Sequence, residues 1–287
     1  MTHGTLYIVA TPLGNLEDIT FRAVNVLKQA DLIAAEDTRH SKKLLAHYGI
    51  TTPLASCHEH NEKKKVPSFI NRLKEGQTIA LISDAGTPCV SDPGYLLVKQ
   101  AATEGIPVLP VPGCSAVIAG LSVSGLPTDA FMFLGFLPRK ASPLDHTLQS
   151  LADIKATLIV YESPRRIKNI IQAMISTWGD RPACLAREIS KLHEEYIRGS
   201  LSEILFQLDE KDRIRGECAL FIGGNTKRSK TIDETRLKQL IKTRLAESEI
   251  GTSDLAKELS DATGLSRKKI YQAILNVRKE DLGPERH

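Results

Sequence analysis

Short apolar runs alternate with amphipathic stretches along the first 225 residues. Eight of these runs have the length of a strand that is buried on both faces. They are Leu6–Ala10, Leu32–Ala35, Ile79–Ile82, Val108–Val111, Phe131–Leu137, Thr157–Tyr161, Ala183–Ala186 and Ala219–Ile222. Helical periodicity lies between them, in Phe21–Gln29, Val66–Leu73, Leu96–Ala102 and Ile167–Ile175. This alternation predicts an α/β architecture with largely parallel sheets.

Turn-forming residues divide this region into two blocks. The break lies near Gly125–Pro127, a stretch rich in turn formers. The second block is more mixed, because Glu194–Arg198 indicates an additional strand next to a helical stretch. We therefore predict one α/β domain at 1–120 and a second at 121–225.

The remaining residues, 226–287, indicate a small all-helical domain. The expected helices are Thr235–Glu247, Asp254–Ser260 and Arg267–Val277. The last two, joined by a turn at Gly264, resemble a helix-turn-helix, whose second helix commonly faces nucleic acid. A helical bundle used for packing or dimerisation is the alternative.

The charge of the chain is concentrated in this helical tail. The formal net charge is +4, and residues 226–287 contain 14 lysines and arginines against 10 aspartates and glutamates. The rest of the chain is therefore balanced. A modest excess of basic residues often only reflects a solvated helical surface. It also attracts a polyanion such as a nucleic acid.

Composition narrows the class of protein. With 41% hydrophobic and 25% charged residues, the chain has the balance of a soluble globular protein. No apolar run approaches the length of a membrane-spanning helix, and Thr5–Ala10 is too short for a signal-peptide core. The five cysteines form no C-x-x-C pair and fit no zinc spacing. We expect a cytoplasmic protein with reduced thiols, no membrane partner and no metal.

The loops that follow the apolar runs carry the candidate chemistry, because ligands bind at the carboxyl ends of strands in open α/β sheets. The loop Ala10–Asn15 contains proline and glycine but matches no nucleotide-binding motif. Ser83–Gly94 is long for a strand-to-helix connection, which usually takes about 2–6 residues. Val111–Ala116 has small residues that let a ligand approach the backbone. Tyr161–Arg166 combines a carboxylate with two arginines, which suits a phosphate or an acidic substrate.

Two further stretches crowd ionisable groups together. They are Ala35–His40 and Arg187–Lys191, each directly after an apolar run. Such density favours shifted pKa values. The two aspartates of Ser83–Gly94 could hold a ribose or the amino group of a ligand. Two side chains in these loops have a simpler interpretation as helix caps, which we prefer for Asp92: Thr38 for the helix that follows it, and Asp92 for a helix that begins at Gly94.

Seven motifs occur in order along the chain, and together they are highly specific. They are Thr11–Asn15, Glu36–Arg39, Ser83–Pro88, Ser91–Gly94, Val111–Ala116, Phe133–Arg139 and Tyr161–Arg165. The set closely resembles the tetrapyrrole methylase superfamily, in its branch of 16S ribosomal RNA ribose methyltransferases. The similarity extends to Gly216–Cys218, and the basic helical tail is also similar to that branch.

The resemblance implies two α/β domains, with the methyl donor S-adenosyl-L-methionine in the cleft between them and usually within a homodimer. The residues that look like donor contacts are Pro12, Gly14, Asp84, Thr87, Val90, Ser115 and Ala116. One departure concerns the substrate. Relatives that modify tetrapyrroles carry a G-D-P loop where this chain has Ser83–Ala85, which argues against a porphyrin.

The implied activity is 2'-O-methylation of a cytidine ribose in the decoding region of 16S ribosomal RNA. A ribose hydroxyl needs a general base, and the candidates are Glu36, Asp37, His40 and Glu162, with Glu188 a further possibility. The candidate RNA contacts are Arg39, Arg165, Arg166, Lys191, Arg267, Lys268 and Lys269. The expected partner is 16S rRNA or the small ribosomal subunit, not DNA. Two alternatives stay open: a methyltransferase for a tetrapyrrole or other small molecule, and a non-catalytic RNA-binding assembly factor.

Overall fold

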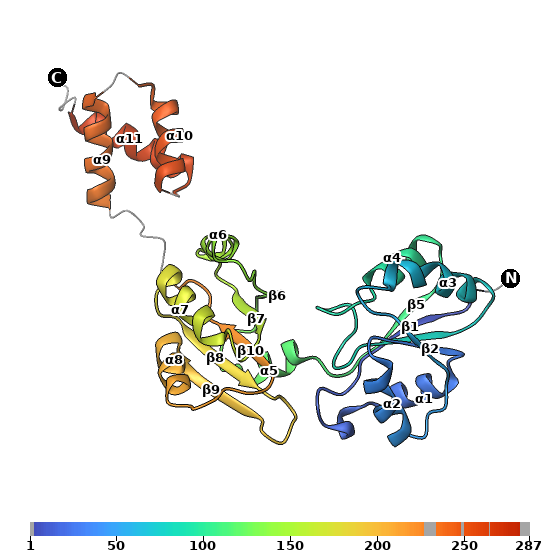
Figure 1. Ribbon diagram of the computed structural model, residues 1–287. Helices are drawn as coiled ribbons and strands as arrows, with labels where there is room; N and C mark the ends of the chain where they lie inside the picture. Colours follow the sequence, from blue (N-terminus) through green and yellow to red (C-terminus); the bar gives the residue numbers. More distant parts are fainter. Residues whose placement is uncertain (1–2, 227–233, 248–249, 264, 282–287) are drawn as a thin grey trace. The chain divides into compact units, whose positions relative to one another are not determined.

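The computed structural model describes residues 3–226, 234–247, 250–263 and 265–281. Within the chain, contacts separate two compact units, residues 1–225 and 226–287. The first unit contains two five-stranded sheets (Figure 1). The boundary predicted at residue 120 falls inside a helix, Ala116–Ser124, so the division of this unit into two domains stays a prediction.

The first sheet is entirely parallel, with the strand order β3-β2-β4-β1-β5. Its strands are β1 Leu6–Val9, β2 Leu32–Ala35, β3 Leu54–Ser56, β4 Ile79–Ile82 and β5 Val108–Val111. Every residue of β2 and β4 is buried, as expected for central strands that helices cover on both faces.

Four helices cover the first sheet, two on each face (Figure 1). They are α1 Phe21–Gln29, α2 Thr38–His47, α3 Glu62–Lys74 and α4 Tyr95–Thr103. The apolar sides of α3 and α4 form one core with one face of the sheet. Those of α1 and α2 pack against the opposite face. Because helices block both faces, ligands reach this sheet only at its strand ends.

The second sheet is mixed, with the order β6-β7-β10-β8-β9, and only β6 and β7 pair in parallel. Its strands are β6 Phe131–Phe136, β7 Thr157–Glu162, β8 Pro182–Arg187, β9 Glu195–Ser200 and β10 Cys218–Ile222. The helices α6 Ala141–Leu151, α7 Ile167–Trp178 and α8 Leu201–Asp209 cover one face of this sheet. The mixed character expected from the sequence is therefore found here.

Helix α5, Ala116–Ser124, covers the other face of the second sheet. Its close approach depends on Gly120, because a Cβ at this position would lie 2.3 Å from Cζ of the buried Phe221 in β10. The N-cap of α5 is Ser115, whose hydroxyl accepts a hydrogen bond from the Ile118 N–H at 3.5 Å. The glycine thus fixes where the first turn of α5 lies.

Both helix caps proposed from the sequence differ in the structure. Asp37, not Thr38, caps α2, since its Oδ1 accepts the Arg39 N–H at 2.8 Å. Asp92 does not cap α4, which begins at Tyr95 and has no capping side chain of its own. The side chain of Glu62, at the start of α3, performs that task instead. Its Oε1 accepts the N–H groups of residues 96 and 97 at 2.9 and 3.2 Å.

The second unit consists of three helices in its described part. They are α9 Glu234–Glu247, α10 Thr252–Thr263 and α11 Arg267–Asp281. Leu237, Leu255, Ile270 and Ile274 belong to its buried core. The turn predicted at Gly264 lies outside the described residues. Among the helices that are described, none has the length and apolarity needed to cross a membrane.

Candidate active site

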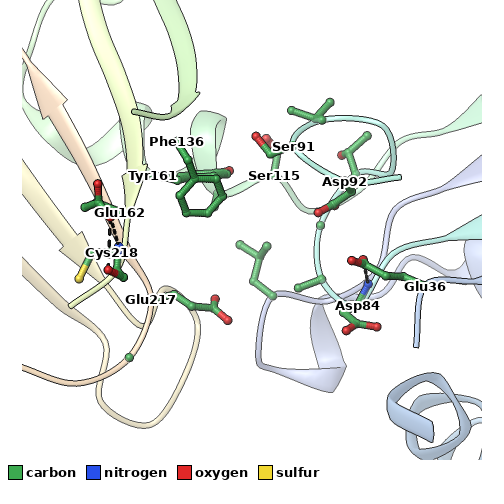
Figure 2. Close-up of a pocket in the computed structure, with 18 of the residues that line it drawn as sticks. Glu36, Asp84, Ser91, Asp92, Ser115, Phe136, Tyr161, Glu162, Glu217 and Cys218 are labelled. Atoms are coloured by element: carbon green, nitrogen blue, oxygen red, sulfur yellow. Dashed lines mark hydrogen bonds between the residues drawn. The ribbon is translucent and has the colours of Figure 1, made fainter. Parts of the chain in front are cut away.

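A pocket of about 440 Å³ lies at the strand ends of the first unit, a volume within the usual range for small-molecule sites. One side comes from the loops after β2, β4 and β5. The other comes from the ends of β6 and β7 and the residues around the start of β10 (Figure 2). The carboxyl ends of neighbouring parallel strands meet at one edge, which brings together loops that are distant in sequence.

Seven of the site residues predicted from the sequence line this pocket. They are Glu36, Asp84, Thr87, Val90, Ser115, Ala116 and Glu162. The pocket therefore collects one candidate base from each sheet together with five of the seven candidate donor contacts. The roles of these residues stay predictions, because the geometry gives their positions alone.

Pro12 and Gly14 do not line the pocket, although Leu13 between them does. Their loop is tied to the long loop after β4 by two hydrogen bonds. The Thr11 N–H donates to the Gly86 carbonyl at 2.9 Å, and the Gly86 N–H donates to the Thr11 carbonyl at 3.0 Å. Pro12 and Gly14 thus lie in a loop that supports the wall of the pocket.

Asp37, Arg39 and His40 lie on or beside the first turn of α2 and do not line the pocket. The Arg39 side chain is 89% exposed and forms an ion pair with Asp37 at 3.1 Å. Hydrogen bonds from Arg39 hold the pKa of the Asp37 carboxyl at about 2. A carboxylate of that kind is a weak base.

The other predicted cations differ in their surroundings. Arg165 is exposed beside the pocket residue Pro164. Arg166 is directed inward, with Nη2 donating to the Pro138 carbonyl at 2.8 Å. Lys191 pairs with Glu188 at 3.0 Å and with a second carboxylate, Glu217, at 3.3 Å. Arg267, Lys268 and Lys269 lie exposed at the start of α11 in the second unit.

The long loop after β4 is held by hydrogen bonds to the residues that follow β2 and β5. The Asp37 N–H donates to Oδ1 of Asp84 at 3.1 Å, and the Asp84 N–H donates to Oε2 of Glu36 at 3.4 Å. On the other side, the Thr87 hydroxyl donates to the carbonyl of Cys114 at 3.1 Å. The loop is therefore a fixed wall.

The backbone of this loop is also strained at two positions. Cys89 and Ser91 have φ angles of 71° and 66°, in the left-handed region that residues other than glycine seldom occupy. They flank Val90, and Ser91 itself lines the pocket. Strain of this kind persists where the surrounding structure over-determines it, and it concentrates at ligand sites.

Five carboxylates line the pocket: Glu36, Asp84, Asp92, Glu162 and Glu217. No lysine or arginine occurs among its lining residues in the described part of the chain. Burial raises the pKa of Glu36. Burial and the charges of the neighbouring carboxylates raise the pKa of Asp92 to about 6. The pocket thus attracts cations and contains a carboxyl group that titrates near neutrality.

Glu162 is engaged by its own surroundings. It is buried, and its Oε1 accepts the Ser163 N–H at 2.7 Å and the Ser163 hydroxyl at 3.3 Å. Oε2 faces Nη1 of Arg166 at 3.4 Å. These contacts hold the wall at the end of β7, and Oε2 itself is buried and accepts no hydrogen bond from the described residues.

Two aromatic side chains of the second sheet face Glu36, Asp84 and Asp92 across the pocket (Figure 2). Phe136 is 62% exposed, and its ring centroid lies 5.8 Å from that of Tyr161 in an edge-to-face arrangement. Phe133 supports Tyr161 from the other side at 4.8 Å. Burial, and secondarily the charge of Asp92, raises the pKa of the Tyr161 hydroxyl to about 12, so this phenol stays protonated.

Several lining residues were missed by the sequence analysis. They are Leu13, Ala85, Gly86, Ser91, Asp92, Phe136, Tyr161, Ser163, Pro164, Gly216, Glu217 and Cys218. Asp92, Phe136 and Tyr161 lie inside motifs that the sequence analysis had singled out, so their loops were recognised and their side chains were not. In the described part of the chain, no cluster of three or more histidine, cysteine or acidic side chains could hold a metal ion.

Comparison with known proteins agrees with this architecture. A family model described as Tetrapyrrole (Corrin/Porphyrin) Methylases matches residues 5–205. Ribosomal RNA small subunit methyltransferase I of Halalkalibacterium halodurans is 51% identical over 222 residues, which cover 77% of this chain and 76% of the relative. The protein of the same name from Pseudomonas aeruginosa is 44% identical over 279 residues, covering 96% and 98%.

Solved structures share the fold at low sequence identity. Diphthine synthase matches with a TM-score of 0.61 at 15% identity, over 78% of this chain and 91% of its own. A cobalt precorrin-4 methyltransferase matches with a TM-score of 0.57 at 19% identity, over 76% of this chain and 94% of its own. A third structure is uroporphyrin-III C-methyltransferase from Thermus thermophilus complexed with S-adenyl homocysteine. It matches with a TM-score of 0.54 at 20% identity, over 77% of this chain and 97% of its own.

These matches confirm the predicted fold class, an α/β protein with two sheets followed by C-terminal helices. The family model covers the first sheet and four of the five strands of the second, from β1 into α8, and the Pseudomonas relative matches almost the whole chain. The chain therefore belongs to the tetrapyrrole (corrin/porphyrin) methylase family, and along most of its length it is similar to ribosomal RNA small subunit methyltransferase I.

Proposed function

We propose that the chain transfers a methyl group from S-adenosylmethionine to the 2'-hydroxyl of a cytidine ribose in the decoding region of 16S ribosomal RNA. The observation that carries the proposal is the carboxylate-lined pocket, in a chain whose relatives are named for methylation of the small-subunit RNA. We further propose a homodimer that acts in the cytoplasm on 16S rRNA or the small subunit, without metal and without DNA.

The pocket fits the donor by charge and size. S-adenosylmethionine carries a positive sulfonium and a positive ammonium group, and five carboxylates attract both. Its carboxylate suits the start of α5, where Ser115 and Ala116 line the pocket and N–H groups at a helix N-terminus favour an anion. Bound there, the donor supplies a methyl group that its positive sulfur has already activated.

The aromatic wall formed by Phe136 and Tyr161 suits an unpaired nucleotide. RNA bases taken out of a stack are commonly held on aromatic side chains. Phe136 offers such a face, because it is largely exposed and braced by Tyr161. Phosphates next to the target need cations outside the acidic pocket, and we assign this role to Arg39 and Arg165. We assign further contacts with RNA phosphates to Arg267–Lys269 of the second unit.

The test is methyl transfer from labelled S-adenosylmethionine to small ribosomal subunits that lack the modification, followed by nuclease mapping. The proposal predicts a single 2'-O-methylated cytidine. Donor binding without transfer to any ribosomal RNA would overturn it in favour of a small-molecule methyltransferase. RNA binding without affinity for the donor, measured by calorimetry, would instead indicate an assembly factor.

A further inference from the structure

We propose that Asp92 is the general base of this site, the carboxylate that takes the proton of the ribose hydroxyl as it is methylated. This inference rests on the proposed function. It names a residue to which the sequence motifs alone assigned a different task, that of a helix cap.

The structure leaves Asp92 without that structural task. Glu62 accepts the N–H groups of Leu96 and Leu97 at the start of α4, so the helix end is satisfied from another element. The N-cap position is Gly94, with no capping side-chain bond. A half-buried carboxylate that no helix end requires, and that lies in a ligand-sized pocket, calls for another explanation.

The backbone aims this carboxylate at the pocket. Ser91 precedes it in the left-handed region at φ 66°, Cys89 adopts the same region at φ 71°, and Pro93 restricts the chain directly after it. Figure 2 shows Asp92 on the side of the pocket opposite Phe136 and Tyr161. A nucleotide stacked on the aromatic wall would therefore present its sugar toward Asp92.

The charged and titratable groups around Asp92 explain its basicity. Glu36 after β2, Asp84 after β4 and Glu217 before β10 are all acidic, and burial together with their charges raises the pKa of Asp92 to about 6. The Ser83 hydroxyl lowers it in part. The remaining neighbours, the Tyr161 phenol and the Cys89 thiol, stay neutral because their pKa values are raised to about 12 and about 11. At pH 7.5 Asp92 is thus mostly ionised, yet it is a stronger base than an ordinary aspartate.

The other carboxylates and the histidine proposed from the sequence are less suited. Asp37 is a weak base because of Arg39, and Lys191 together with a backbone N–H lowers the pKa of Glu188. Asp37, Glu188 and the histidine, His40, also do not line the pocket. Of the other carboxylates that line it, Glu36, Asp84 and Glu162 accept hydrogen bonds from backbone N–H groups, and Glu217 forms an ion pair with Lys191. Asp92 is the pocket carboxyl that combines position with a pKa near neutrality.

The step balances with one proton and one electron pair. As the ribose oxygen forms its bond to the methyl carbon, its proton moves to an Oδ atom of Asp92. The carbon–sulfur bond breaks with its electron pair on sulfur, so the positive sulfonium becomes a neutral thioether. Asp92 then returns its proton to water.

The experiment compares Asp92→Asn and Asp92→Glu with the wild-type chain in single-turnover methyl transfer to small ribosomal subunits, from pH 5 to 9. We expect the wild-type rate to fall below about pH 6 with a slope of one proton, since the base must be ionised. Asp92→Asn should lose about 100-fold or more, the usual contribution of a general base, and its residual rate should not show the acid limb. Asp92→Glu should keep the limb and part of the rate.

Donor affinity separates a base from a binding residue. Calorimetry with S-adenosylmethionine should show a loss of affinity for Asp92→Asn that is far smaller than its loss of rate at saturating donor, because the variant neutralises only one of the five pocket carboxylates. Asp145→Asn, an exposed aspartate on α6 outside the pocket, is the matched control and should change neither the rate nor the Kd. An acid limb that persists in Asp92→Asn, a rate within threefold of wild type, or a loss confined to donor Kd would each overturn the proposal. Wild-type chain that binds the donor and methylates no ribosomal RNA would overturn the proposed function instead.

Discussion

Phe136 exposes most of its ring at the pocket, although an apolar side chain of this size is usually buried. Stacking of a base on an aromatic side chain is worth about 1–3 kcal/mol. We therefore expect Phe136→Ala to raise the KM for ribosomal RNA by about 5-fold to 150-fold in steady-state assays. The Kd for the donor should stay unchanged, because the variant removes no carboxylate.

Phe206 on α8 is the matched control for this prediction. Its side chain is 64% exposed, much like that of Phe136, and it does not line the pocket. Phe206→Ala should leave the KM for RNA unchanged, and Phe136→Tyr should retain most of the affinity because it keeps a ring. If Phe136→Ala and Phe206→Ala raised the KM for RNA equally, Phe136 would have no specific role in stacking a base.

The chemistry of single residues was partly visible in the sequence. The loops that form the pocket were recognised, and Asp84, Thr87 and Ser115 line its wall, while their role as donor contacts stays a prediction. The assignment of Asp92 failed because Glu62 takes over its expected task, and nothing in one sequence shows that a side chain on one helix reaches the start of another. Whether a distant side chain accepts hydrogen bonds from the free N–H groups at a helix start depends on tertiary packing.

The start of α4 gives a prediction at the scale of an element. Loss of a side-chain cap costs about 0.5–2 kcal/mol, and Glu62 accepts two N–H groups at this position. Glu62→Ala should therefore lower the free energy of unfolding of the first unit by about 1–2 kcal/mol, measured by urea denaturation. Glu62→Gln retains an acceptor oxygen and should lose clearly less. If the glutamine variant is as unstable as the alanine variant, the charge rather than the cap stabilises this region.

Elements were predictable in proportion to their burial. The strands β2 and β4 have the bounds expected from the sequence, because continuous apolar runs mark strands covered on both faces. Strand β3 was missed, since it has three half-buried residues at the sheet edge and no β-branched side chain. Helix α6 was missed as well, because only two of its residues are buried and its apolar pattern is weak.

At the scale of the whole molecule, acidic and basic side chains have separate places. The pocket is lined by carboxylates, which suits a cationic donor and repels RNA phosphates. The basic excess lies in residues 226–287. There, a surface pocket of about 590 Å³ is lined by Lys238, Lys268 and Lys269. A sequence-level charge count located this excess, but the structure was needed to show that lysines from α9 and α11 share one hollow.

If this hollow binds RNA phosphates, its contribution depends on salt in a calculable way. Each phosphate contact with a single strand adds about 0.7 to the slope of log K against log salt concentration. The full-length variant Lys268→Ala with Lys269→Ala should therefore weaken RNA binding and reduce that slope by about 1.4, measured by titration at several salt concentrations. Lys63→Ala with Lys64→Ala, an exposed pair on α3, removes the same charge and should leave the slope nearly unchanged. A slope that does not change in either double variant would favour the alternative use of the helical tail, packing or dimerisation, and the phosphate contacts would then have to come from arginines of the first unit.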